Sequence, residues 1–73
     1  MRKEQKIYPE THPLHQIRNA RRMLKEVIDH TRSGATMIHD PKAQTLMETS
    51  AEVLVGLLKA YDDYEQKSEQ ACL

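Results

Sequence analysis

The feature that most constrains this chain is the recurrence of apolar residues at every third or fourth position. In the first half of the chain the series is Leu14, Ile17, Ala20, Leu24, Val27, Ile28, Thr31, Ala35 and Ile38. In the second half it is Ala43, Leu46, Met47, Ser50, Val53, Leu54, Leu57, Leu58, Tyr61 and Tyr64. This spacing places the apolar side chains on one side of an α-helix, and the alternation typical of strands is absent. The pattern therefore predicts an all-α chain with two amphipathic helices.

The first helix is predicted at about residues 12–35. Thr11 is a residue type that often caps a helix start, and Pro13 is tolerated in a first turn because its missing N–H would have no partner there. Gly34 is typical of a helix end, although the apolar series continues beyond it. The end of this helix is therefore expected between Gly34 and about residue 37.

The second helix is predicted at about residues 41–68. Asp40 followed by Pro41 is the clearest start signal in the chain, because aspartate caps helices and proline favours the first helical position. Residues 69–73 are expected to form a frayed tail. Residues 1–10 have no apolar periodicity, so we expect a flexible N-terminal arm.

Residues 11–68 are expected to fold as one antiparallel helical hairpin. The register is left open by the sequence, because the apolar pattern repeats with every helical turn. A tight turn would set Ile17 near Tyr61, whereas a looped turn that starts at Gly34 would set Ile17 near Leu57. Both registers match apolar residues with apolar residues.

The charge distribution supports antiparallel pairing. The start of the first helix is basic and the end of the second is acidic, so the hairpin would bring opposite charges together. The residues concerned are Arg18, Arg21, Arg22 and Lys25 on one side and Asp62, Asp63 and Glu65 on the other. Exposed pairs of this kind are expected to contribute only about 0.2–1 kcal/mol each.

The second helix has more apolar surface than one neighbouring helix can cover. Its apolar residues span about half of the circumference, whereas a two-helix seam needs about two positions in seven. A lone hairpin would expose either Met47, Leu54 and Leu58 or Val53 and Leu57. We therefore expect a homodimer that forms a four-helix bundle, or a tetramer, with burial by a different protein as the alternative. The expected self-association interface contains Ile17, Leu24, Ile28, Leu46, Met47, Leu54, Leu57, Leu58, Tyr61 and Tyr64.

Residues suited to catalysis or metal binding are few. The chain has one cysteine, Cys72, so it has no internal disulfide, and it has no nucleophile–base arrangement or phosphate-binding glycine loop. His12 and His15 are three residues apart, but a structural zinc site needs four ligands and no cysteine or carboxylate follows them on the same side. We expect no metal, no cofactor and no enzymatic activity.

The segment HQIRNA, which begins at His15, resembles the H-box of sensor histidine kinases. In that family a histidine on a helical hairpin accepts a phosphoryl group, and the hairpins dimerise into four-helix bundles. Gln16 stands where the family has an acidic residue, and Ala20 stands where it has proline. The resemblance implies a phosphotransfer relay module that uses His15, as an alternative function.

The overall charge limits the other classes of function. The chain has eleven basic and eleven acidic residues, and this neutral balance argues against a nucleic-acid-binding protein. A stripe formed by Arg18, Arg22 and Lys25 keeps a nucleic-acid accessory role as a further alternative. No apolar run has the length of a membrane span or a signal peptide, so we expect a cytoplasmic protein.

The sequence therefore favours a small helical module that self-associates and serves in protein–protein interaction or as a scaffold. Three residues on the first helix are candidates for binding a partner. They are His15, Arg18 and Arg22.

Overall fold

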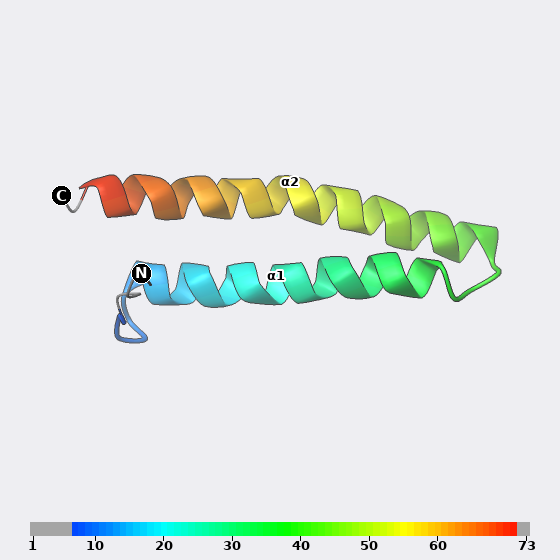
Figure 1. Cartoon of the computed structure of the whole chain (residues 1–73), viewed down its shortest axis with the longest axis horizontal. Coiled ribbons are helices and arrows are strands. Elements are labelled where there is room, and N and C mark those ends of the chain that lie inside the picture. Colours follow the sequence, from blue (N-terminus) through cyan, green and yellow to red (C-terminus); the bar gives the residue numbers. More distant parts are fainter. Residues whose placement is uncertain (1–6, 72–73) are drawn as a thin grey trace, which may run out of the picture.

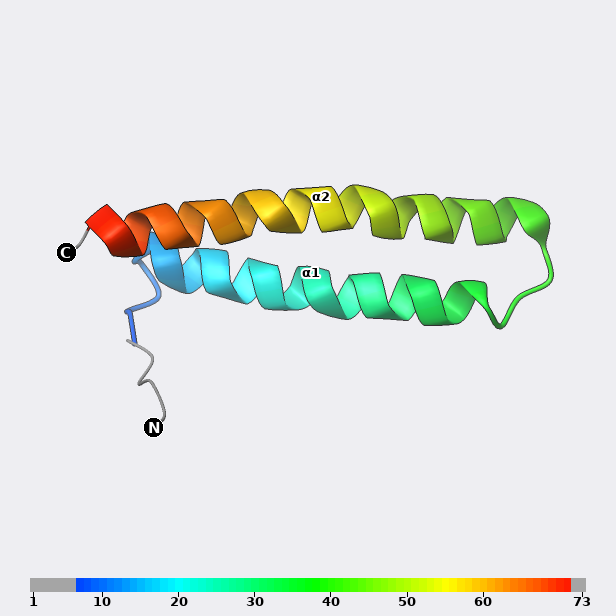
Figure 2. The ribbon, with the colours of Figure 1, turned by 45° about the horizontal axis from the view of Figure 1, so that its top comes forward.

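The chain folds as a helical hairpin in a computed structural model that describes residues 7–71. Helix α1 spans Pro13–Ala35 and helix α2 spans Pro41–Ala71. The two helices lie side by side and run in opposite directions, joined by a short connection at one end (Figure 1). They stay adjacent when the view is turned by 45° (Figure 2). The predicted all-α fold and its hairpin are confirmed.

The N-cap of α1 lies one residue after the expected cap, Thr11. His12 is the N-cap, with an extended backbone, and its ring Nδ1 accepts a hydrogen bond from the Leu14 backbone N–H at 3.0 Å. The prediction of Thr11 as the cap was wrong, because the imidazole provides the acceptor that a hydroxyl normally supplies. Pro13 occupies the first helical position, as expected.

The residues just before α1 fold back onto its first turn. The Tyr8 ring stacks on the His12 ring with 4.2 Å between the ring centroids. The His12 backbone N–H donates to the carbonyl oxygen of Pro9 at 2.8 Å. The predicted arm at 1–10 lies partly in residues 1–6, which are outside the described residues, whereas its last part is fastened to α1 by these contacts.

The connection between the helices is held by hydrogen bonds to the last turn of α1. The Met37 N–H donates to the Gly34 carbonyl oxygen at 3.0 Å. The Gln44 side-chain amide donates to the carbonyl oxygens of Ala35 at 3.3 Å and Ile38 at 2.6 Å. A side chain from α2 thus satisfies carbonyl groups that the end of α1 would otherwise leave without partners.

Helix α2 begins as the sequence predicts. The Asp40 carboxylate accepts a hydrogen bond from the Lys42 N–H at 3.1 Å, and Pro41 is the first helical residue. The helix continues to Ala71, three residues beyond its predicted end at 68. Part of the expected frayed tail is therefore helical, and residues 72–73 lie outside the described residues.

The buried core is a narrow seam between the two helices. The seam positions on each helix are spaced alternately by three and four residues, which keeps them facing the opposite helix. We call this set the hairpin seam: Leu14, Ile17, Arg21, Leu24, Ile28, Thr31 and Ala35 of α1, and Met47, Ala51, Leu54, Leu58, Tyr61 and Glu65 of α2. Its most buried apolar members are Leu14, Ile28, Ala35 and Ala51.

The contacts across the seam fix the register. A Cβ atom placed on Gly34 would lie 2.8 Å from Cε of Met47, so α1 and α2 approach closely there. Counting from this contact in opposite directions along the two helices sets Ile17 about level with Tyr64. The looped-turn register, with Ile17 near Leu57, is therefore wrong. The tight-turn register, with Ile17 near Tyr61, differs from the observed one by about one helical turn.

Candidate interaction surface

Large apolar side chains remain exposed along both helices. On α1 they are Met23 and Val27, which are 50% and 45% exposed. On α2 the exposed fractions are 67% for Leu46, 64% for Val53, and 44% for both Leu57 and Tyr64. Single exposed apolar residues are ordinary on protein surfaces, whereas a continuous set is typical of a binding surface. Their arrangement therefore matters more than their number.

These exposed residues follow the same three-and-four spacing as the hairpin seam, displaced by one residue. Val27 directly precedes the seam residue Ile28, and Leu57 directly precedes the seam residue Leu58. One step back along an α-helix turns by about 100°. Because α1 and α2 are antiparallel, this step turns both helices toward the same side of the hairpin. We call the apolar members of the resulting surface the apolar face: Ala20, Met23 and Val27 of α1, and Leu46, Val53, Leu57, Ala60 and Tyr64 of α2. Three polar residues lie at the same spacing and interrupt it: Gln16, His30 and Ser50.

The opposite side of the hairpin is charged. Residues that directly follow seam positions gather there, and a shallow open depression between the helices is lined by Arg32 of α1 and by Glu48, Ala51 and Glu52 of α2. Arg32, Glu48 and Glu52 thus lie on one side although they come from both helices. This agrees with the helical geometry that places the preceding residues together on the other side.

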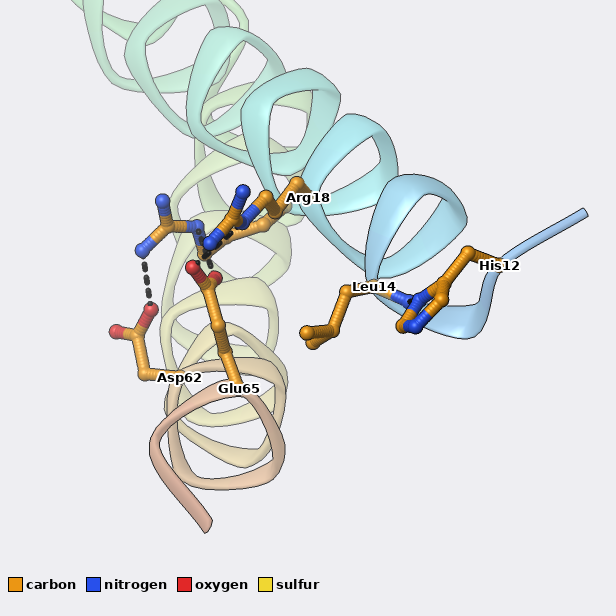
Figure 3. Close-up of polar contacts among 6 residues, drawn as sticks. His12, Leu14, Arg18, Asp62 and Glu65 are labelled. Carbon is orange, nitrogen blue, oxygen red and sulfur yellow. Dashed lines mark hydrogen bonds and ion pairs between the residues drawn. The ribbon is translucent and has the colours of Figure 1, made fainter. Parts of the chain in front are cut away.

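A cluster of ion pairs lies at the open end of the hairpin. Arg18 Nε donates to Glu65 Oε2 at 2.9 Å, and Arg21 Nη1 donates to Asp62 Oδ1 at 2.9 Å. Arg21 Nε also lies 3.6 Å from Glu65 Oε1. Figure 3 shows the Glu65 carboxylate pointing from α2 toward Arg18 on α1. The expected pairing of the basic start of α1 with the acidic end of α2 is therefore present.

Glu65 is more buried than the sequence suggested. Its side chain is 11% exposed, and that of Arg18 is 19% exposed. Within the described part of the chain Glu65 Oε1 has no hydrogen-bond partner, and Arg21 Nε lies 3.6 Å from it. A carboxylate in this position depends strongly on its arginine partners, because desolvation is costly for an unpaired charge. The expectation that all these pairs are exposed was wrong for Glu65.

The ten residues predicted for self-association divide into two groups. Seven are buried or half-buried where α1 meets α2: Ile17, Leu24, Ile28, Met47, Leu54, Leu58 and Tyr61. The other three, Leu46, Leu57 and Tyr64, belong to the exposed apolar face. Of the two sets that a lone hairpin was expected to expose, the structure exposes Val53 and Leu57.

Sequence reasoning left three exposed residues out of the predicted interface. They are Met23, Val27 and Val53. The signal was present in the spacing, because Ala20, Met23 and Val27 repeat by three and four residues beside the stripe that was chosen. Two overlapping apolar stripes on one helix can be told apart only when the position of the helix that packs against it is known.

The arginine candidates for partner binding are engaged within the hairpin. Besides its pair with Glu65, the Arg18 guanidinium carbon lies 5.2 Å from the centre of the Tyr8 ring. Arg22 Nη1 donates to Glu26 Oε2 at 3.3 Å on the exposed surface. A nucleic acid would have to replace these partners before the stripe of Arg18, Arg22 and Lys25 could contact phosphates.

His15 is also held by its neighbours. Its Nδ1 lies 3.0 Å from the Tyr8 carbonyl oxygen, a contact in which the ring nitrogen must donate. Its Nε2 then accepts from the side-chain amide of Asn19 at 3.1 Å. Both ring nitrogens therefore have partners, and a phosphoryl acceptor would need to release Asn19.

The described residues contain neither a metal-binding cluster nor a membrane-spanning helix. Between residues 7 and 71, no group of three histidine, cysteine, aspartate or glutamate side chains is close enough to hold a metal ion. In the same part of the chain, neither helix combines the length and apolar character needed to cross a membrane.

Comparisons with models of protein families, with curated proteins and with solved structures give no significant match.

Proposed function

We propose that this chain is a small non-catalytic helical module that self-associates through its apolar face and serves in protein–protein interaction or as a scaffold. The observation that carries this proposal is the stripe of exposed apolar side chains beside the hairpin seam. Large contiguous apolar patches are uncommon on monomeric proteins, because water contact with such surface is unfavourable. Burial against another protein surface removes this cost.

A second hairpin is a suitable cover for such a face. Each helix of the hairpin already uses one stripe in the seam, and the displaced stripe widens its apolar side to what a helix inside a bundle requires. Two hairpins that meet by their apolar faces form a four-helix bundle with an isologous interface, in which the same patch is used by both chains. The charged side would then face solvent or a further partner.

The proposal is tested by the dissociation constant of the homodimer, measured by sedimentation equilibrium. Leu57→Glu places a charge in the apolar face, and we expect it to raise the dissociation constant at least about a hundredfold, since a buried unpaired charge is strongly unfavourable. Gln66→Glu adds the same charge at an exposed position that follows the seam residue Glu65, and it should leave the dissociation constant nearly unchanged. Equal effects of the two variants, or a wild-type chain that never associates, would contradict the proposal.

A further inference from the structure

We infer that the segment of residues 7–11, which we call the N-terminal strap, is a pH-sensitive element of this fold. The strap folds back on the start of α1 while the His12 ring is neutral, and it is released when that ring gains a proton. Histidine is the side chain that ordinarily changes its charge between about pH 5 and 8. The strap and its contacts lie within one hairpin, so they do not depend on the proposed self-association.

The cap of α1 requires a neutral His12 ring. The Leu14 backbone N–H donates to His12 Nδ1 at 3.0 Å, so this nitrogen must carry a lone pair (Figure 3). In a protonated imidazole both ring nitrogens carry hydrogen, and neither can accept. Protonation would therefore remove the acceptor and leave the Leu14 N–H without its cap. The positive charge would also lie at the N-terminus of a 23-residue helix, where the helix dipole disfavours a cation.

The His12 ring also holds the strap by stacking. The Tyr8 ring lies on it with 4.2 Å between the centroids and an angle of 29° between the ring planes. The guanidinium carbon of Arg18 lies 5.2 Å from the centre of the same Tyr8 ring. A protonated His12 would thus bring a second positive charge to a ring that already has a cation beside it. Repulsion between the two charges would offset the attraction of a cation for an aromatic ring.

The second histidine beside the strap responds differently to protonation. His15 Nδ1 donates to the Tyr8 carbonyl oxygen at 3.0 Å, and a protonated ring can donate there equally well. Its Nε2 lies 3.1 Å from the Asn19 side-chain amide, which could turn and present its oxygen to a protonated ring. His12 is therefore the histidine whose observed contact must break when the ring is protonated.

The surroundings of His12 offer its cation no buried counter-charge. The titratable and charged groups of the described residues at this end of the hairpin come from the strap, from α1 and from α2. They are Tyr8 and Glu10, His15 and Arg18, and Glu65 and Lys67. Glu10 is exposed, and Glu65, the buried carboxylate among the described residues, already accepts from Arg18 at 2.9 Å. The strap is therefore fastened at higher pH and released as the pH falls through the titration of His12.

Release of the strap is expected to be a local change. The pairs of Arg18 with Glu65 and of Arg21 with Asp62 join α1 to α2 without any strap residue. The buried apolar residues of the hairpin seam also lie outside the strap. The hairpin should therefore persist, while the Tyr8 ring leaves the Arg18 guanidinium that it now contacts.

Nuclear magnetic resonance of the full-length chain tests this inference between about pH 8 and about pH 5. The Hε1 signal of His12 reports the protonation of its ring. We expect the Leu14 amide proton signal to move toward its value in an unstructured chain, and the Tyr8 ring signals to move toward those of an exposed tyrosine. Both changes should have the same midpoint as the His12 signal. Circular dichroism should show nearly constant helix content over this range.

Two variants assign the effect to His12. His12→Asn supplies a side-chain oxygen that caps a helix but does not titrate, so its Leu14 amide signal should no longer follow the pH. His15→Gln keeps a donor for the Tyr8 carbonyl oxygen, and it should leave the pH dependence of the Leu14 signal in place.

Three results would overturn the inference. The first is a wild-type chain in which the Leu14 and Tyr8 signals stay constant while the His12 ring titrates. The second is a full pH response of the Leu14 signal in His12→Asn. The third is a loss of helix content with the same midpoint, which would mean that the whole hairpin unfolds and the strap is not released alone.

Discussion

The hairpin seam and the apolar face follow the same residue spacing, yet they differ in chemistry. The seam includes two charged positions, Arg21 and Glu65, which are paired across the helices near the open end. The apolar face has no acidic residue, lysine or arginine among its members, and its large side chains are about half exposed. The two stripes lie one residue apart along each helix, so this difference does not come from helix geometry.

The hairpin seam and the apolar face select their partners in different ways. Apolar residues at repeated spacing allow several registers, because each shift by one turn restores the match. A charged residue in such a seam disfavours the shifted registers, since they leave it buried without a partner. Arg18, Arg21 and Glu65 therefore specify how α1 meets α2, whereas the members of the apolar face form no such ion pair.

The largest effect is expected when two neighbouring residues of α1 are substituted in turn, because one is buried and the other is exposed. Ile28 is 4% exposed in the seam and Val27 is 45% exposed in the apolar face. Ile28→Ala should lower the free energy of unfolding by about 3 kcal/mol, because it removes buried methyl groups and leaves a cavity. Val27→Ala should instead raise the dimer dissociation constant about tenfold, a change of about 1.4 kcal/mol. Urea denaturation and sedimentation equilibrium measure the two quantities.

The pair is informative because the substitutions are adjacent and similar in size. The distinction between seam and face would be lost if Val27→Ala destabilised the fold as much as Ile28→Ala at every chain concentration.

A somewhat smaller effect is expected for the charged part of the seam. Glu65→Ala should cost about 2 kcal/mol of unfolding free energy, since it leaves two arginines around a partly buried space without their shared carboxylate. Asp62→Ala should cost less than about 1 kcal/mol, because the Asp62 side chain is 41% exposed and water replaces its contact with Arg21. Urea denaturation of both variants gives the comparison. Equal losses would mean that the burial of Glu65 has no energetic consequence.

The smallest effects concern the two glycines. Gly56 has nothing within 4 Å of an added Cβ, so Gly56→Ala should stabilise α2 by about 1 kcal/mol. Gly34→Ala should gain less, because its Cβ would displace the end of the Met47 side chain. Thermal unfolding of the two variants tests this order, and a larger gain from Gly34→Ala would show that α1 and α2 do not approach closely at that point.

Much of the fold could be predicted from local signals in the sequence. The Asp40–Pro41 start of α2 is confirmed, and Pro13 lies at the first position of α1 as expected. The cap of α1 could not be predicted, because it depends on the His12 ring, which stacks on Tyr8. Residue preferences at helix starts rank a hydroxyl above an imidazole and take no account of such a contact.

The site was predicted only in outline. The sequence indicated surplus apolar surface on α2, and Leu46, Leu57 and Tyr64 are indeed exposed. It could not separate the seam from the apolar face, because both stripes lie within one broad apolar side of each helix. The separation depends on the register, which in turn is fixed by contacts between residues distant in sequence, such as Arg18 with Glu65.

The mass of the native protein in solution, measured by light scattering after gel filtration, tests the central claim most directly. One chain has a mass of 8.5 kDa. Self-association through the apolar face predicts a discrete species with twice the mass of one chain. A monodisperse monomer at high protein concentration would contradict it, and the apolar face would then require a different protein as its partner.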